Sequence, residues 1–285
     1  MKIYLLIFVA ALVLASCTKE KSFEPGNGDS TGNMLVKRTI KLGSDSINTL
    51  YTYNNKNQLT SYTTAGVFNI PGYGSVPVSE ERKFIRDGQG IIQQFVRVSS
   101  DFLSSTVDST VFHLRYDASK SRYTSAVATA MDGGVMEKDS VAYTYNSAGR
   151  ISQFEYFHDD GISGGYQEDF KMEFTYDSKG NIIRDRSFSY DQSRGAYEET
   201  AEEKFEYDDK VSPLVLGIEA FLLEEFVSVS PNNVTKSTFV DLEDPSENDT
   251  STITYTYNTD NKPATASSSS QSSAGISIPI NYVYK

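Results

Sequence analysis

The segment Tyr143–Ile151 reads YTYNSAGRI, and the segment Phe174–Ile182 reads FTYDSKGNI. In both segments, two aromatic residues separated by one residue precede an Asp or Asn. A glycine follows three positions after the Asp or Asn, and an aliphatic residue follows two positions after the glycine. The phrase recurs as YTYNNKNQL and, more loosely, as FIRDGQGII. The Asp or Asn positions, degenerate copies included, are 54, 87, 117, 146, 177, 208 and 258, so all intervals except the last are 29–33 residues. This period indicates one unit of structure that is copied along the chain.

Each unit is predicted to be a strand, a tight turn and a returning strand. Tyr, Phe, Thr, Ile and Val suit the half-buried surface of a sheet. Asp or Asn at the strand end can accept a hydrogen bond from the backbone two residues later and so begin a turn. The following Gly or Asn supplies the left-handed backbone conformation that short hairpin loops need.

Sixteen antiparallel strands are expected when both strands of every unit are counted. They are 34–42, 46–53, 58–64, 78–86, 91–99, 108–116, 121–131, 135–145, 150–157, 167–176, 181–190, 197–207, 234–242, 250–257, 262–270 and 276–284. Because strand direction alternates, the repeated turns fall at one end of the sheet. The less regular loops 65–77, 100–107, 158–166, 191–196, 243–249 and 271–275 fall at the other.

A sheet of this size cannot stay flat, because twist makes it curl, split or close. Closure also removes the exposed edges that would recruit other chains. The expected fold is therefore all-β, an antiparallel meander of about 14–16 strands that closes into a large, water-soluble barrel. A strongly curved open sheet is the alternative.

One segment departs from the strand pattern. Ser212 followed by Pro213 suits the start of a helix. One apolar helix face is formed by Leu214, Ile218, Phe221, Leu222 and Phe226. The pattern predicts one short helix near 213–226, on the concave side of the sheet or in a barrel mouth. An apolar linker with one helical turn is the alternative.

The first sixteen residues are predicted to be a lipoprotein signal peptide. Lys2 precedes an apolar stretch too short to span a membrane. The single cysteine, Cys17, follows Leu14-Ala-Ser in a sequence that resembles a bacterial lipobox. Cleavage before Cys17 and its acylation would leave residues 17–33 as a flexible tether and residues 34–285 as one barrel domain. An ordinary secretory signal with an incidental cysteine is the alternative.

The chain is acidic, with a formal net charge of −12 over 285 residues. It would be repelled by phosphate backbones, so nucleic acid is not expected as a partner. With one cysteine it has no internal disulfide, and its stability must come from core area.

The predicted strand 197–207 carries charge on both of its alternate faces, with Glu203 on one face and Glu202 and Lys204 on the other. A lipid-facing strand needs an unbroken apolar face. A barrel that is tethered beside a membrane is therefore expected rather than one that spans it.

The repeated phrase resembles the YD-type repeats of Rhs and teneurin shells. A fuller similarity is to an uncharacterised family of Bacteroidetes lipoproteins that is described as having a porin-like β-barrel fold. The residues that carry this similarity are Leu14–Cys17, Tyr176–Gly180, Tyr207–Lys210, Asn232–Lys236 and Tyr255–Asn258. The resemblance implies an outer-membrane lipoprotein of the cell envelope, periplasmic or surface-exposed, and it transfers no catalytic residue.

The sequence contains no recognisable catalytic motif. His113 and His158, the two histidines, have no Cys or His placed to complete a zinc site. Neither a nucleophile elbow nor a phosphate-binding loop is present. The acidic stretches 159–160 and 241–249 could bind calcium, although solvated loops are the simpler interpretation. No catalytic residue, metal or cofactor is therefore assigned.

The irregular loops are the candidate binding surface, since exposed aromatic and acidic loop residues often contact partners. The candidate residues are Phe68, Tyr73, His158, Asp159, Asp160 and Tyr166. Together they could hold a glycan or a protein. Alternatively, Phe68 and Tyr73 fold inward and cap the barrel end.

The leading hypothesis is a non-enzymatic protein that binds or scaffolds a ligand at the cell envelope and is held to the membrane by a lipid on Cys17. A hydrolase of envelope or polysaccharide substrates that uses loop carboxylates is the first alternative. An outer-membrane channel is the second.

Overall fold

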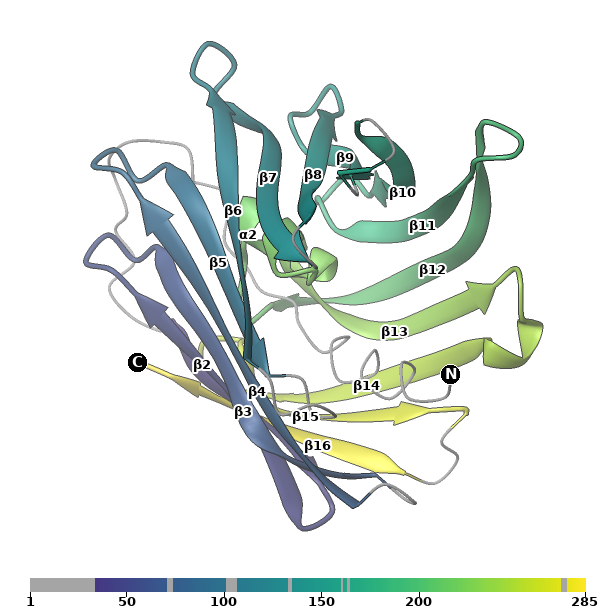
Figure 1. The fold of residues 1–285 in the computed structure, drawn as a ribbon. Helices are drawn as coiled ribbons and strands as arrows, with labels where there is room; N and C mark the ends of the chain where they lie inside the picture. The colour runs from purple at the N-terminus through teal and green to yellow at the C-terminus, as the bar shows by residue number, and fades with distance from the viewer. Residues whose placement is uncertain are drawn as a thin grey trace.

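The computed structural model describes residues 34–285 apart from 71–73, 101–106, 133–134, 160, 163–164 and 273–275. Within these residues sixteen strands form one closed antiparallel barrel, in which each strand pairs with its sequence neighbours and β1 pairs with β16 (Figure 1). The strands are β1 Leu35–Leu42, β2 Asp45–Tyr53, β3 Leu59–Ile70, β4 Gly74–Arg86, β5 Ile92–Ser100, β6 Val107–Asp117, β7 Arg122–Asp132, β8 Val135–Tyr145, β9 Ile151–Asp159, β10 Gln167–Tyr176, β11 Ile182–Asp191, β12 Ala196–Val211, β13 Asn232–Asp241, β14 Asp249–Tyr257, β15 Pro263–Ser270 and β16 Ser277–Tyr284. The predicted meander is confirmed, and it closes into a barrel rather than remaining an open sheet.

The repeated turns form as their residue types predict. After β8, Asn146 Oδ1 accepts a hydrogen bond from the backbone N–H of Arg150 at 3.1 Å. Gly149 between them takes a φ of +78°. Where glycine is absent, Asn57 and Asn261 take the same left-handed conformation, with φ of +59° and +56°. Asn tolerates this region better than most residues, because its short polar side chain can bond the local backbone.

In four copies of the phrase, the second aromatic residue ties its strand to the preceding strand at the turn end. The hydroxyl of Tyr145 in β8 donates a hydrogen bond to the carbonyl of Tyr123 in β7, at 2.9 Å. Tyr176 in β10 donates in the same way to Ile151 in β9, at 2.6 Å. The same bond joins Tyr53 to Leu35 and Tyr207 to Ile182. Two tyrosines at other positions, Tyr255 and Tyr284, also donate to carbonyls of the preceding strand, those of Val234 and Pro263. The sequence repeat thus places an equivalent tyrosine hydrogen bond between neighbouring strands in successive repeats.

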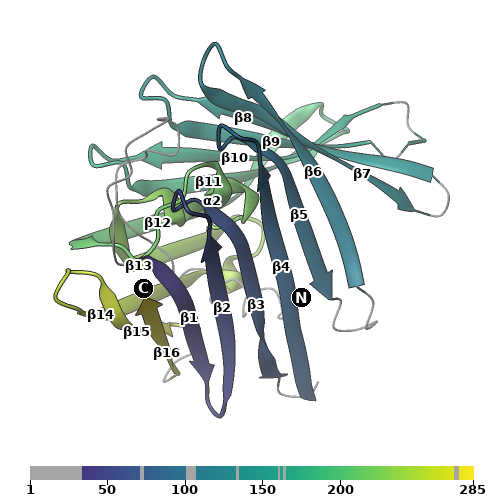
Figure 2. The same cartoon turned by 90° about the vertical axis from the view of Figure 1, so that its left-hand side faces the viewer.

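The segment between β12 and β13 lies inside the barrel, toward the end that carries the repeated turns (Figures 1 and 2). Residues 212–230 are here named the plug. The plug contains one short α-helix, α2 Ile218–Leu222, and a 3₁₀ helix, η1 Phe226–Val229. Most of its apolar side chains are buried, among them Leu214 and Leu216. The prediction of a short helix in a barrel mouth agrees with this position.

The predicted start of the helix is wrong. Ser212 and Pro213 do not begin it; Gly217 directly precedes α2. The N–H of Leu216 instead donates a hydrogen bond to the carbonyl of Ser228, at 2.9 Å. This bond ties the entry of the plug to its exit and holds the entry outside the helix. The local capping signal is therefore overridden by a contact with a residue far along the chain.

Aromatic rings hold the plug against the barrel wall. The ring of Phe226 lies 5.1 Å from that of Phe174 in β10 and 5.5 Å from that of Phe154 in β9, between centroids. Phe221 lies 5.3 Å from Phe174. Such pairs contribute about 0.5–1.5 kcal/mol each beyond the burial of their area. Two residues of the predicted apolar face, Phe221 and Phe226, therefore contact the wall.

The strand register identifies the inward and outward faces, because directly paired residues share a face. Phe174 contacts the plug and so faces inward. Its partner in β11 is Asp185, and the partner of Asp185 in β12 is Glu203. These two buried carboxyl groups therefore line the interior. The next residues along, Arg184 and Glu202, point outward and form an ion pair there.

Two predicted loop boundaries are wrong. β3 and β4 extend well into the predicted loop 65–77 and pair there, with Phe68 of β3 opposite Val76. β9 likewise continues through Asp159 and shortens the predicted loop 158–166. In both places cross-strand hydrogen bonding continues for as long as a partner strand is present. The residues typical of strands end earlier in the sequence than the strand pairing ends in the structure.

Candidate functional site

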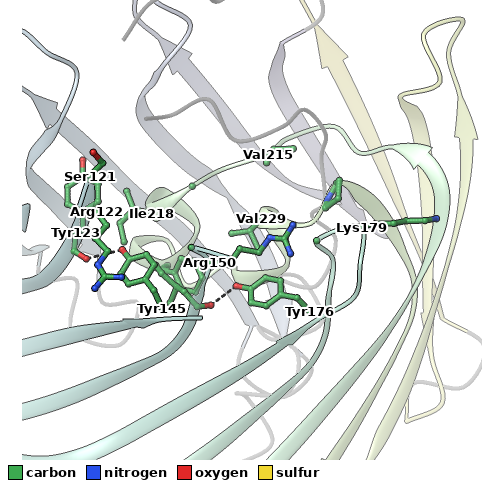
Figure 3. A pocket seen from close by; sticks show the side chains of 16 residues that line it. Ser121, Arg122, Tyr123, Tyr145, Arg150, Tyr176, Lys179, Val215, Ile218 and Val229 are labelled. Atoms are coloured by element: carbon green, nitrogen blue, oxygen red, sulfur yellow. Dashed lines mark hydrogen bonds between the residues drawn. The ribbon is translucent and has the colours of Figure 1, made fainter. Parts of the chain in front are cut away.

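A cavity of about 250 Å³ lies between the plug and the turns that follow β8 and β10 (Figure 3). It is here named the turn-end pocket. The hairpins contribute Arg122, Tyr145, Arg150 and Tyr176 to its wall, and the plug contributes apolar residues such as Ile218. The meander places equivalent positions of successive repeats side by side, so residues that are distant in sequence meet at this pocket.

Two arginines lie against tyrosine rings in the wall of the pocket. Arg122 Cζ is 4.9 Å from the ring centroid of Tyr145, and Arg150 Cζ is 5.5 Å from that of Tyr176. Both rings are held in place by the hydroxyl hydrogen bonds to strand carbonyls. A guanidinium over an aromatic face is stabilised by about 0.5–1 kcal/mol. Lys179 adds a positive charge at the rim, where its side chain extends away from Arg150 (Figure 3).

Buried charges also fasten the plug to the barrel wall. Glu225 Oε1 lies 3.8 Å from Arg38 Nη2 of β1 and accepts a hydrogen bond from the hydroxyl of Tyr62 in β3, at 2.7 Å. Burial raises the pKa of Glu225, and the positive charge of Arg38 opposes that rise. Glu219 of α2 forms an ion pair with Arg86 of β4. The plug is thus bound to the wall by polar contacts as well as by aromatic ones.

A second candidate site is the buried carboxyl pair on the interior wall. Burial raises the pKa of Asp185 to about 7. Burial and the neighbouring charge of Asp185 raise the pKa of Glu203 well above its usual range. Within the described structure, Glu203 Oε1 has no hydrogen-bond partner. Carboxyl groups with such raised pKa values are suited to acid–base chemistry near neutral pH.

Three of the residues that the sequence suggested for a binding loop, His158, Asp159 and Tyr166, lie in the described part of the structure. His158 and Asp159 end β9 and point to opposite faces, because side chains alternate along a strand. His158 Nδ1 lies 2.9 Å from Asp139 Oδ1 on the inward face. Asp159 accepts a hydrogen bond from Lys138 at 3.4 Å on the outward face. Tyr166 is about half exposed just before β10.

The remaining predicted residues lie outside the described part of the chain. They are Cys17, Tyr73 and Asp160, together with the side chain of Phe68. Among the described residues, no three His, Cys, Asp or Glu side chains are placed to hold a metal ion. No helix in the described ranges is long and apolar enough to cross a membrane.

Sequence reasoning missed the turn-end pocket. Arg150 and Lys179 occupy positions that differ among the copies of the repeated turn, and a basic residue in a turn is usually solvated. A signal was present, since the phrase YTYNSAGRI has its arginine directly before the aliphatic position. That signal becomes informative only when barrel closure and the plug turn the hairpin ends into the wall of a cavity.

No protein-family model matches this chain, and no curated protein is similar to it. Among solved structures, a porin-like protein from Bacteroides uniformis matches with a TM-score of 0.50 and 14% identity, over 88% of this chain and 98% of that one. A porin-like protein from Bacteroides vulgatus matches with a TM-score of 0.51 and 12% identity, over 89% of this chain and 99% of that one.

This chain has a porin-like fold. The barrel that the family resemblance implied is therefore confirmed. At such low identity the likeness extends to the fold alone. The lipid anchor and the resemblance to YD-type repeats stay predictions.

Proposed function

We propose that this chain is a non-enzymatic, lipid-anchored protein of the cell envelope that binds a small ligand in the turn-end pocket. The observation that carries the proposal is the pocket itself, an accessible cavity between a fastened plug and rigid hairpin ends. Ligand sites are typically concave, with a few polar groups among apolar ones. The described lining contains no carboxylate or imidazole, which favours binding over acid–base catalysis.

The outer face of the barrel supports a water-soluble body. Lys83 and Glu81 form an outward ion pair at 2.8 Å on β4, and Arg184 pairs with Glu202 across β11 and β12. A charged residue on a lipid-facing strand costs about 2–4 kcal/mol at the bilayer midplane. The plug also lies inside the barrel, at the repeated-turn end, where a channel would need an opening. Both observations favour a tethered barrel over a channel.

Membrane attachment is predicted to depend on Cys17. Expressed in a bacterium with a lipoprotein-processing envelope, the full chain should stay with the membranes through a high-salt wash, because a multi-chain lipid anchor holds firmly. The Cys17→Ser chain should appear in the soluble fraction, whereas Ser16→Ala should remain bound. Fractionation and the mass of the N-terminal peptide measure this. A washed Cys17→Ser chain that still fractionates with membranes would contradict the anchor.

Binding without turnover is the expected behaviour of the detergent-solubilised full chain. In a panel of envelope glycans and peptides, saturation-transfer NMR should detect a bound ligand while chromatography detects no product. Val215→Trp, which fills the pocket wall, should weaken that binding about 10-fold or more. Ile162→Trp, at a residue 78% exposed, is the matched control. Equal binding by Val215→Trp would remove the pocket from the proposal.

A second candidate function, hydrolysis, is favoured by the pair Asp185 and Glu203, which could act as acid and base. The predicted loop carboxylates Asp159 and Asp160 would have no part in it. The same panel of compounds tests this function. If Glu203→Gln abolishes turnover of a compound and the exposed variant Glu206→Gln retains it, hydrolysis would replace binding as the proposed function.

A further inference from the structure

We propose that the barrel lies against an anionic lipid surface with the end that carries the repeated turns, and that its opposite end faces away from the membrane. The two ends are here named the turn end and the loop end. The inference rests on the proposed function, because it orients the tethered barrel on the membrane that its anchor would enter. It follows from the place where the chain enters the barrel and from the distribution of charge between the two ends.

The chain enters the barrel at the turn end. The carbonyl of Met34, directly before β1, accepts a hydrogen bond from the backbone N–H of Lys285, the last residue, at 3.1 Å. The next carbonyl, that of Leu35, accepts one from the hydroxyl of Tyr53, which directly precedes the first repeated turn. Figure 2 accordingly shows β1 beginning beside the C-terminus. The predicted tether, residues 17–33, therefore joins the barrel at its turn end.

The height of the barrel makes this point of attachment matter. A strand of 11 residues such as β8 rises about 36 Å, which is about 25–30 Å along the axis of a barrel with tilted strands. A flexible tether of the length of residues 17–33 has an average span of about 20–25 Å. The turn end can contact the membrane while such a tether is relaxed. Contact through the loop end would require the tether to be stretched along the whole barrel.

The loop end carries most of the negative charge of the chain. Its segment 242–248, between β13 and β14, contains Glu243, Asp244 and Glu247 and no basic residue. The strand ends on this side add Asp45, Asp108, Glu137, Asp159, Glu168, Asp169, Asp191, Glu198, Asp241 and Asp249, whereas the basic residues there are Lys41, Lys138 and Arg194. A surface of anionic headgroups repels an end with this charge.

The turn end instead presents cations that are not neutralised by a paired carboxylate. Its basic residues that form no ion pair within the described structure include Lys56, Arg122, Arg150, Lys179 and Lys285. Three of them, Lys56, Lys179 and Lys285, are exposed. Each lysine ammonium has three N–H donors, and Lys56 uses one of them on the carbonyl of Gly88. The remaining donors can bind headgroup phosphates.

Several carboxylates of the turn end already have local partners. Asp117 and Asp209 form ion pairs with Lys120 and Lys210, at 3.3 and 3.1 Å. The carboxylates that accept hydrogen bonds from backbone N–H groups of their own turns include Asp87 and Asp177. The unpaired cations are therefore the groups of this end that lack a protein counter-charge.

The net charge of −12 does not prevent this contact. The Debye length is about 8 Å at physiological ionic strength, far less than the height of the barrel, so a headgroup at the turn end is screened from the loop end. Each Lys or Arg near an anionic surface strengthens the attraction. The turn-end pocket is lined by Gly149, Lys179 and Gly180 of the same turns, so its ligand would enter on the membrane side.

The test places a fluorescent dye at either end of the lipidated full chain in vesicles that contain phosphatidylglycerol and a lipid with a spin-labelled headgroup. A maleimide attaches the dye to Ser147→Cys, in a repeated turn, or to Ser193→Cys, in a turn of the loop end. Both serines are exposed, and the acylated sulfur of Cys17 does not react. At low salt the dye at position 147 should lose most of its fluorescence, and the dye at position 193 should keep it.

Charge variants test the contribution of the cations. Lys56→Glu combined with Lys179→Glu should restore much of the fluorescence at position 147, because the surface then repels the turn end. Lys41→Glu combined with Arg194→Glu makes the same change of net charge at the loop end and should leave the quenching unchanged. Full quenching in the first double variant would contradict the contact with an anionic surface.

The remaining outcomes separate the orientation from the anchor. Equal quenching of the two dyes, or stronger quenching at position 193, in a chain that floats with the vesicles would overturn the orientation and leave the anchor in place. A chain that does not float with the vesicles would overturn the proposed anchor and the orientation together.

Discussion

Glu225→Ala is expected to lower the free energy of unfolding by about 3–5 kcal/mol, the usual cost of removing one partner from a buried ion pair. The carboxylate of Glu225 is the plug's contact with both Arg38 and the hydroxyl of Tyr62. All three residues are buried, at 3–7% exposure, so water cannot replace the lost partner. Chemical denaturation followed by circular dichroism measures the change.

The neighbouring residue is the matched control for this variant. Glu224 is exposed and lies 3.7 Å from Arg97, so Glu224→Ala should change stability by no more than about 1 kcal/mol. Glu225→Gln should lie between the two, because an amide oxygen can still accept the hydrogen bond of Tyr62. Equal stabilities for Glu224→Ala and Glu225→Ala would show that the buried charge does not fasten the plug.

The barrel is expected to lose stability as pH rises from about 4 to 7, because the folded state holds protons on Asp185 and Glu203 that the unfolded state releases. The pKa of Asp185 rises from 3.8 to about 7 on folding, and that of Glu203 also rises. For a raised carboxyl pKa, the stabilising contribution is full below the unfolded pKa and is lost as pH passes the folded one.

Asp185→Asn and Glu203→Gln should each flatten this pH dependence and stabilise the protein above pH 7. Either amide removes one buried charge and offers a donor to the remaining carboxylate. Glu206→Gln, on the outward face of β12 and 66% exposed, should leave the profile unchanged. Melting temperatures between pH 4 and 8 provide the measurement. A wild-type profile that rises across this range would mean that the pair is ionised in the folded state.

The two buried sets of charges have different consequences for function. Glu219 and Glu225 are bonded to cations and position the plug, which forms one wall of the turn-end pocket. Asp185 and Glu203 are paired with each other in the register of β11 and β12, and burial raises the pKa of both. Loss of the first pair should therefore weaken ligand binding together with stability. Loss of the second should change stability and leave the pocket intact.

The fold was largely predictable from the repeat, because a turn signal is local. Asn146 and Gly149 need only their own neighbours to form a tight turn, and alternating aromatic and Thr residues need only a partner strand. The strand count and the segregation of the turns at one end follow from these local rules. The boundaries failed where pairing depends on the partner, as in β3 and β4 beyond residue 65.

The candidate sites were not predictable in the same way. Asp185 and Glu203 are eighteen residues apart in the sequence, and only the register of β11 and β12 places them opposite each other. The residues chosen from the loops were selected for expected exposure. His158 and Asp159 proved to be strand residues on opposite faces instead.

By itself, the sequence determined the hairpin unit, its period and the all-β meander, since each depends on interactions within a few residues of a turn. The tertiary structure decided that the sheet closes rather than staying open, how residues 212–230 fold inside it, and that Arg122 and Arg150 face a cavity. Closure and insertion depend on contacts between segments far apart in the chain, such as Glu225 with Arg38. No local pattern encodes those contacts, because their free energy arises only when the distant partners are buried together.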